Sequence, residues 1–177
     1  EFKNASSLFN HSKINNIKSN YFDESWELPW GEVKTIRNNY NEKVISFGDE
    51  NNDETFKLIF RAYDDGISFR YRVEDLLNAN DSIIITDELT QFNLIEDANV
   101  WWTPAYGSNR YEELYLNTKV TEIDTVHTPL TIRYNNGIHI SIHEASLVNY
   151  SSMQLFHSNN RKLNCDLAPW ANGDKVR

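Results

Sequence analysis

The chain has 177 residues, of which 26 are acidic and 17 basic, and its formal net charge is −9. This length allows one domain with a hydrophobic core, and it is too short for such a domain plus a catalytic barrel. The acidic balance would repel a phosphate backbone, so we expect no nucleic-acid partner.

The cysteine content, the apolar runs and the two ends of the chain limit the class of protein further. The single cysteine, Cys165, excludes an internal disulfide framework, and we expect a buried thiol. No run approaches the roughly 18 apolar residues of a membrane span, so no membrane partner is expected, and the first residues lack a signal-peptide pattern. The final residues, Gly173 to Arg177, are typical of a turn before a strand, so we expect a fragment.

The first part of the chain predicts strands. Two candidates, Val33–Arg37 and Lys43–Phe47, precede the clearest alternation of apolar and polar residues, which runs from Thr55 to Tyr63. Asp64-Asp65-Gly66 then has turn chemistry, because glycine accepts a positive φ, and Ile67–Val73 alternates again. Together these segments predict a β-hairpin.

The middle of the chain gives weaker patterns. Ser82–Thr86 and Thr90–Ile95 are strand candidates by composition. Helical periodicity is limited to one turn at Glu74–Ala79 and two turns at Tyr111–Leu116.

A second hairpin is predicted toward the C-terminus. Leu130–Tyr134 and Ile138–His143 flank Asn135-Asn136-Gly137, a turn of the Asn-Gly kind, and Met153–Phe156 is a further strand candidate. Many strands without alternating helices predict an all-β fold of antiparallel sheets packed face to face.

Glu144 is the residue whose position most needs explaining. Ile138, Ile140 and Ile142 share one face of the predicted strand, and Glu144 continues it. An unpaired carboxylate is costly to bury, so it must be neutralised, contact a cation or emerge at the edge of the sheet. The pattern alone leaves three interpretations open: a solvent-facing strand end, a metal ligand and a catalytic carboxylate.

Histidine and tryptophan side chains offer less specific signals. His139 and His143 are four strand residues apart, roughly 13 Å, which is too far for them to share one metal ion readily. The tryptophans lie beside turn-like segments and suit core packing, a domain contact or stacking on a sugar ring. They are Trp26, Trp30, Trp101, Trp102 and Trp170.

Five stretches, in order, resemble the glycoside hydrolases of family 97, typified by a bacterial starch-utilisation α-glucosidase. The first three are Phe22–Trp26 with Trp30-Gly31-Glu32, Ile36–Glu42, and Asp65–Tyr71. Trp102-Thr103-Pro104 follows, and the strongest is Gly137–Ser151.

The resemblance implies an antiparallel β-supersandwich of the galactose mutarotase-like kind, incomplete at both ends, which spans residues 1–177 as part of an N-terminal domain. The family's catalytic (β/α)₈ barrel and C-terminal β-domain are expected to lie outside this sequence. The parent protein is accordingly expected to be a glycosidase of α-glucosides, or of α-galactosides, located in the periplasm or otherwise outside the cytoplasm. Its substrates would be α-linked glucosides or oligosaccharides.

The resemblance also implies a role for one residue. In the family, catalysis uses Ca²⁺ and barrel carboxylates, while the sandwich contributes one calcium ligand from the segment that matches Glu144. No catalytic residue is expected in this chain, which by itself should be inactive and bind Ca²⁺ weakly or not at all. The rival hypotheses are a free-standing carbohydrate-binding β-sandwich and a non-carbohydrate interaction domain with an aromatic surface.

Overall fold

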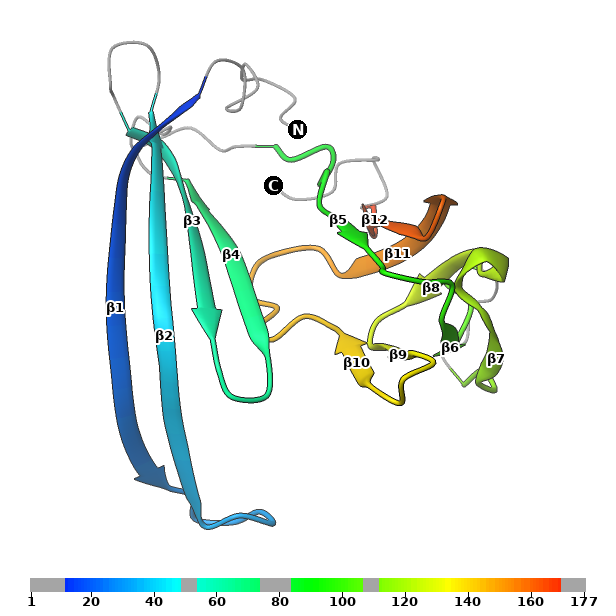
Figure 1. Ribbon diagram of the computed structural model, residues 1–177, viewed down its shortest axis with the longest axis horizontal. Helices are drawn as coiled ribbons and strands as arrows, with labels where there is room; N and C mark the ends of the chain where they lie inside the picture. Colours follow the sequence, from blue (N-terminus) through cyan, green and yellow to red (C-terminus); the bar gives the residue numbers. More distant parts are fainter. Residues whose placement is uncertain (1–11, 49–53, 74–83, 107–111, 170–177) are drawn as a thin grey trace. The chain divides into compact units, whose positions relative to one another are not determined.

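The computed structural model describes residues 12–48, 54–73, 84–106 and 112–169 (Figure 1). The chain divides into two compact units. The N-terminal unit is Ser6–Asp81, and the C-terminal unit is Ser82–Arg177 together with Glu1–Ala5. No helix within the described ranges is long and apolar enough to cross a membrane.

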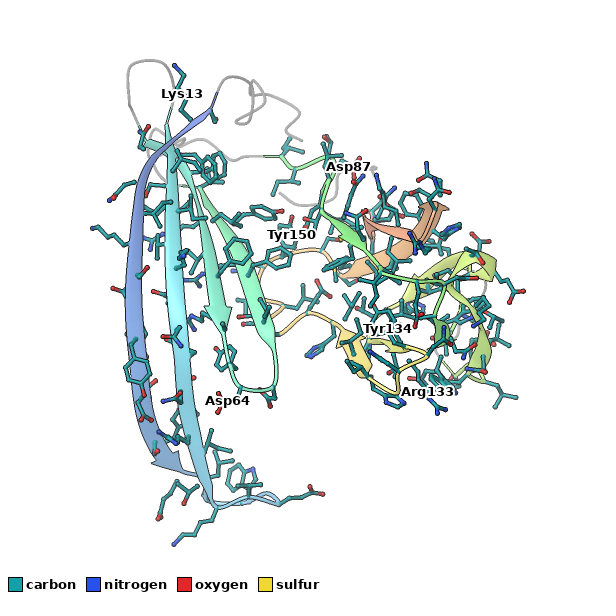
Figure 2. The ribbon with its side chains drawn as sticks, in the orientation of Figure 1. Lys13, Asp64, Asp87, Arg133, Tyr134 and Tyr150 are labelled. Atoms are coloured by element: carbon teal, nitrogen blue, oxygen red, sulfur yellow. The ribbon has the colours of Figure 1, made fainter. Side chains whose placement is uncertain are left out.

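The N-terminal unit contains one antiparallel sheet with the strand order β1-β2-β3-β4 (Figure 1). Its strands are β1 Lys13–Glu27, β2 Thr35–Gly48, β3 Glu54–Ala62 and β4 Ile67–Val73. The β3–β4 pair is the first predicted hairpin, and Figure 2 shows Asp64 at its tip. The turn closes with a 2.8 Å hydrogen bond from Tyr63 N to Gly66 O. Gly66 itself does not adopt a positive φ, contrary to the expectation.

Strands β1 and β2 continue beyond the rest of this sheet as a two-stranded ribbon. β3 pairs with β2 only as far as Ala62↔Asn41, whereas β1 and β2 stay paired to Glu27↔Thr35. Within the ribbon, the Arg37 guanidinium donates two hydrogen bonds to the Asp23 carboxylate, at 2.8 and 2.6 Å. These bonds lower the pKa of Asp23 to about 2. Side-chain pairs across the ribbon thus supplement its backbone ladder.

The C-terminal unit contains two antiparallel sheets, with strand orders β10-β9-β6-β7 and β5-β12-β11-β8. The strands are β5 Gln91–Asn93, β6 Asn99–Trp102, β7 Leu116–Lys119, β8 Thr125–His127, β9 Leu130–Arg133, β10 His139–Ile142, β11 Met153–Asn159 and β12 Lys162–Leu167. The β9–β10 pair is the second predicted hairpin. Gly137 has φ 88° in its turn, a conformation that side chains with a Cβ rarely adopt.

One apolar core lies between these two sheets. Every second residue of β12 is buried, and these residues meet inward-facing residues from β6, β8, β9 and β11. The fully buried side chains at the centre include Val100, Leu130, Ile132, Leu155, Leu163 and Leu167. Face-to-face packing of antiparallel sheets over a shared core is a sandwich arrangement, so the predicted all-β class is confirmed.

Several predicted elements differ from the structure. Tyr111–Leu116 does not form the predicted helix: residues 112–115 are irregular, and Leu116 begins β7, where it pairs with Trp102. Val33–Arg37 and Lys43–Phe47 overlap a single strand, β2, because β1 pairs along all of it. Ser82–Thr86 forms no strand over its described residues apart from a bridge residue at Ile85, and Glu74–Ala79 lies outside the described residues.

Truncation of a core leucine tests this packing. Leu155 is fully buried, so Leu155→Ala should lower the free energy of unfolding by about 2–5 kcal/mol, through lost burial and the cavity left behind. The matched control, Leu114→Ala, removes a side chain that is 88% exposed and should change stability by less than about 0.5 kcal/mol. Urea unfolding followed by tryptophan fluorescence measures both. Equal losses would contradict the assignment of the core.

The Cys165 thiol provides a second test. Burial, assisted by the nearby carboxylates Glu88, Glu144 and Asp87, raises the pKa of Cys165 to about 12. A thiol reagent at pH 8 should therefore label the unfolded chain but not the folded one. Because the thiol pKa is higher in the folded state, this group's contribution to stability is present below about pH 8.5 and is lost as the pH rises toward 12. Rapid labelling of the folded protein would refute the burial.

Candidate functional site

Glu144 lies just after β10, at the start of the loop that joins β10 to β11. β10 ends at Ile142, two residues before Glu144. Glu144 therefore does not continue the strand, contrary to the prediction. Of the three isoleucines predicted to share a strand face, Ile142 packs against the core of the C-terminal unit, whereas Ile138 is 55% exposed and Ile140 is 38% exposed. The Glu144 side chain is partly buried because of its loop, not because it continues an apolar strand face.

The surroundings of Glu144 are acidic. Glu144, Glu88 and Asp87 all lie close enough to Cys165 for their charges to raise its pKa. Within the described part of the chain, the Glu144 carboxylate has no hydrogen-bond or ion-pair partner, although its backbone oxygen contacts His143 Nδ1 at 3.1 Å. A partly buried carboxylate without a hydrogen-bond or ion-pair partner is a suitable ligand for a cation.

A cavity of about 250 Å³ opens in the same unit. Three of its lining residues are carboxylates, two are amides and the rest are apolar or sulfur-containing. They are Asp87, Glu88, Asp166, Gln91, Asn164, Leu89, Phe156 and Cys165. The Tyr106 hydroxyl holds the side chain of Asp166, one of these lining residues, through a 3.1 Å contact to Oδ2, and it also contacts Gln154 Oε1 at 3.3 Å. The lining contains acceptors but no lysine or arginine, so it does not suit an anion.

Sequence reasoning missed the hydrogen bonds that link Glu88 to distant parts of the unit. Glu88 Oε2 accepts a hydrogen bond from the Tyr150 hydroxyl at 3.0 Å, and Glu88 Oε1 accepts one from Thr90 Oγ1 at 2.7 Å. Figure 2 shows Tyr150 on the β10–β11 loop and Asp87, the neighbour of Glu88 in the chain. Tyr150 and Glu88 are 62 residues apart, and no periodic pattern in the sequence connects them.

The histidines do not form a metal site. His139 belongs to β10 and stacks on Trp101 with ring centroids 6.4 Å apart, while His143 lies in the following loop. Within the described ranges, no group of three or more histidine, cysteine, aspartate or glutamate side chains converges to hold a metal ion. A cation at Glu144 would therefore take most of its ligands from elsewhere.

The tryptophans divide between the core and the surface. Trp101 and Trp102 belong to β6 and Trp26 belongs to β1, so the prediction that they lie beside turn-like segments and not inside strands is wrong for these three. Trp102 is 7% exposed and donates Nε1–H to Thr118 Oγ1 at 3.0 Å, as a core residue does. Trp30 lies between β1 and β2 and is 83% exposed. Trp170 lies outside the described residues.

A calcium ion, which the family resemblance implies, fits the chemistry of Glu144 in part. Ca²⁺ prefers carboxylate oxygen and needs six to eight oxygen ligands. Glu144 offers an unpaired carboxylate in acidic surroundings, which suits one of those ligands. The described residues include no group of three or more histidine, cysteine, aspartate or glutamate side chains that could complete such a site with it.

Comparisons with known proteins agree on one family. The family model described as "Glycosyl-hydrolase 97 N-terminal" matches residues 1–171. A glycoside hydrolase family 97 enzyme from Pseudoalteromonas sp., solved in complex with acarbose, is 37% identical with a TM-score of 0.91; the match covers 99% of this chain and 27% of that one. A second structure of a family 97 enzyme from that organism, in complex with panose, gives the same values.

More distant relatives agree with this assignment. The retaining alpha-galactosidase of Bacteroides thetaiotaomicron is 24% identical over 158 residues, which are 82% of this chain and 22% of the relative. A β-arabinopyranosidase structure is 19% identical with a TM-score of 0.78, covers 92% of this chain and 28% of that one, and shows the same fold. The chain thus spans 22–28% of the length of these relatives. It belongs to glycoside hydrolase family 97 and corresponds to the N-terminal domain of that family.

Proposed function

We propose that this chain is the non-catalytic N-terminal part of a calcium-dependent α-glycoside hydrolase. Its structural role is to support the barrel that carries the catalytic carboxylates. Its chemical role is to supply one calcium ligand, the carboxylate of Glu144. The chain by itself is then inactive and binds Ca²⁺ weakly or not at all, because one carboxylate cannot satisfy the ion.

The state of Glu144 carries this proposal. The side chain is partly buried and unpaired among the described residues, and like Glu88 and Asp87 it lies near enough to Cys165 to act on its pKa. Such a carboxylate is unfavourable unless a positive charge approaches it. The absence of a complete ligand group in the described ranges agrees with a site that is shared with another part of the protein.

The division of labour follows from the chemistry of glycoside cleavage. Hydrolysis needs two carboxyl groups on either side of the glycosidic bond, and we assign both to the barrel. A bound calcium ion would supply positive charge that polarises a substrate oxygen. Glu144 would hold and orient that ion, and the sandwich core would keep the loop of Glu144 in place. No residue of this chain is assigned a proton-transfer role.

We propose α-linked glucosides or oligosaccharides as substrates of the whole protein. The relatives solved with acarbose and panose are 37% identical, whereas the retaining alpha-galactosidase is 24% identical, so α-glucosides are tested before α-galactosides. We extend the proposal to a periplasmic or otherwise extracytoplasmic location, on the basis of the family resemblance alone.

A carbohydrate-binding module is the second candidate. The exposure of two aromatic side chains favours it: Trp30 is 83% exposed and Trp26 is 44% exposed, near the end of the β1–β2 ribbon. An exposed indole offers a flat apolar face on which a sugar ring can stack. Titration of this chain with maltooligosaccharides separates the two candidates. Saturable binding that Trp30→Ala abolishes would count against a purely supporting role.

Substitution of Glu144 tests the main proposal. In the full-length protein, Glu144→Gln and treatment with a chelator should each lower kcat/KM on an aryl α-glucoside by at least about tenfold, since both weaken calcium binding. Added Ca²⁺ should restore the chelated wild type fully and the variant only at higher concentration. Hydrolysis rates measured across a calcium titration provide the comparison.

The control for this test is Glu113→Gln, which neutralises an exposed glutamate in the same unit. It should leave kcat/KM and the calcium requirement unchanged. Full activity of Glu144→Gln at low calcium would refute the assignment of Glu144. Activity that no chelator affects would refute the calcium dependence itself.

A further inference from the structure

The loop that carries Glu144 is fixed at its C-terminal end. This loop, residues 143–152, joins β10 to β11 and includes several exposed apolar side chains, among them Val148 at 71% exposure. Near β11, the buried Ser151 donates its hydroxyl to Ala168 O, and Ala168 N donates to Ser152 O at 3.0 Å. These contacts fix residues 151–152, but they leave the segment from Glu144 to Tyr150 dependent on other contacts.

Tyr150 ties that segment to Glu88. Its hydroxyl donates a hydrogen bond to Glu88 Oε2 at 3.0 Å, and Thr90 Oγ1 donates one to Glu88 Oε1 at 2.7 Å. Each oxygen of the Glu88 carboxylate therefore accepts a hydrogen bond. Hydrogen bonds to an ionised acceptor are stronger than those between neutral groups. Thr90 is itself fixed, because its backbone oxygen accepts a hydrogen bond from Cys165 N of β12 at 3.0 Å.

A continuous chain of contacts therefore runs from the β12 strand to the loop. It passes from Cys165 to Thr90, then to Glu88, and ends at Tyr150. Glu144 lies six residues before Tyr150, and its carboxylate shares the acidic surroundings of Cys165 with Glu88. A loop held at a second point samples fewer conformations, which lowers the entropic cost of placing its carboxylate on an ion.

We infer that Tyr150 and Glu88 are positioning residues, which hold the β10–β11 loop so that Glu144 presents its carboxylate to the cation. This inference rests on the proposed function of Glu144. Glu88 is assigned this role through its hydrogen bond to Tyr150, and its substitution, described below, tests positioning against direct ligation.

Tyr150→Phe in the full-length protein tests the inference, because it removes the hydroxyl and keeps the ring. We expect the dissociation constant for Ca²⁺, measured by titration calorimetry, to rise about tenfold. In calcium-free protein, amide hydrogen exchange should accelerate in residues 145–149 and stay unchanged in β11 and β12. The control is Tyr115→Phe, which changes a tyrosine that is 64% exposed and should alter neither quantity.

Glu88→Gln distinguishes positioning from direct binding. If Glu88 acts through Tyr150, Glu88→Gln should weaken calcium binding no more than Tyr150→Phe does, because a neutral amide is a poorer acceptor for the Tyr150 hydroxyl. The double variant should bind calcium about as weakly as Tyr150→Phe alone, because both changes act on one contact. A much larger loss with Glu88→Gln, additive with Tyr150→Phe, would identify Glu88 as a ligand and overturn the inference. If Tyr150→Phe lowers the melting temperature but leaves calcium affinity unchanged, the contact between Tyr150 and Glu88 only stabilises the fold, and the inference is likewise overturned.

Glu144→Gln, measured beside these variants, separates the two proposals. If Glu144→Gln weakens calcium binding and Tyr150→Phe does not, only the positioning role fails. If Glu144→Gln leaves calcium binding unchanged, the proposed function fails, and the positioning role fails with it.

Discussion

The two sheets of the C-terminal unit depend on one constraint, the burial of alternate side chains against a single apolar core. Leu163 and Leu167 of β12 face this core together with Leu130 and Ile132 of β9, and all four are fully buried. A shift of one residue in any strand would turn these side chains outward, so the core fixes the register of each strand. Fixed register in turn fixes where each strand ends and where its loop begins.

The candidate site depends on those loop positions. β10 ends at Ile142, whose side chain packs on the core, and Glu144 follows in the loop between β10 and β11. On the other sheet, β12 holds Thr90 through its backbone, and this places Glu88 within reach of Tyr150. Polar residues from separate loops therefore meet without any strand of their own, which is typical of functional groups carried on a rigid scaffold.

The sequence predicted the parts of the fold in which one strand face is buried or a turn has distinctive residues. The hairpins at Asp64 and Gly137 are examples. It did not predict β1, because its side chains are exposed along its whole length and it has no alternating pattern. β12 does alternate, with Leu163, Cys165 and Leu167 buried, so its own residues carry a strand signal. The contacts of Glu88 could not be predicted, because they join residues that only the tertiary fold brings together.

We propose that Glu144 is a calcium ligand which this domain supplies to a site completed elsewhere in the protein. The decisive experiment is a crystal structure of the full-length protein grown with Ca²⁺, with the ion located by anomalous scattering. We predict a Glu144 carboxylate oxygen at about 2.3–2.6 Å from the ion, with the other protein ligands from outside residues 1–177. A calcium ion whose ligands do not include Glu144 would contradict it.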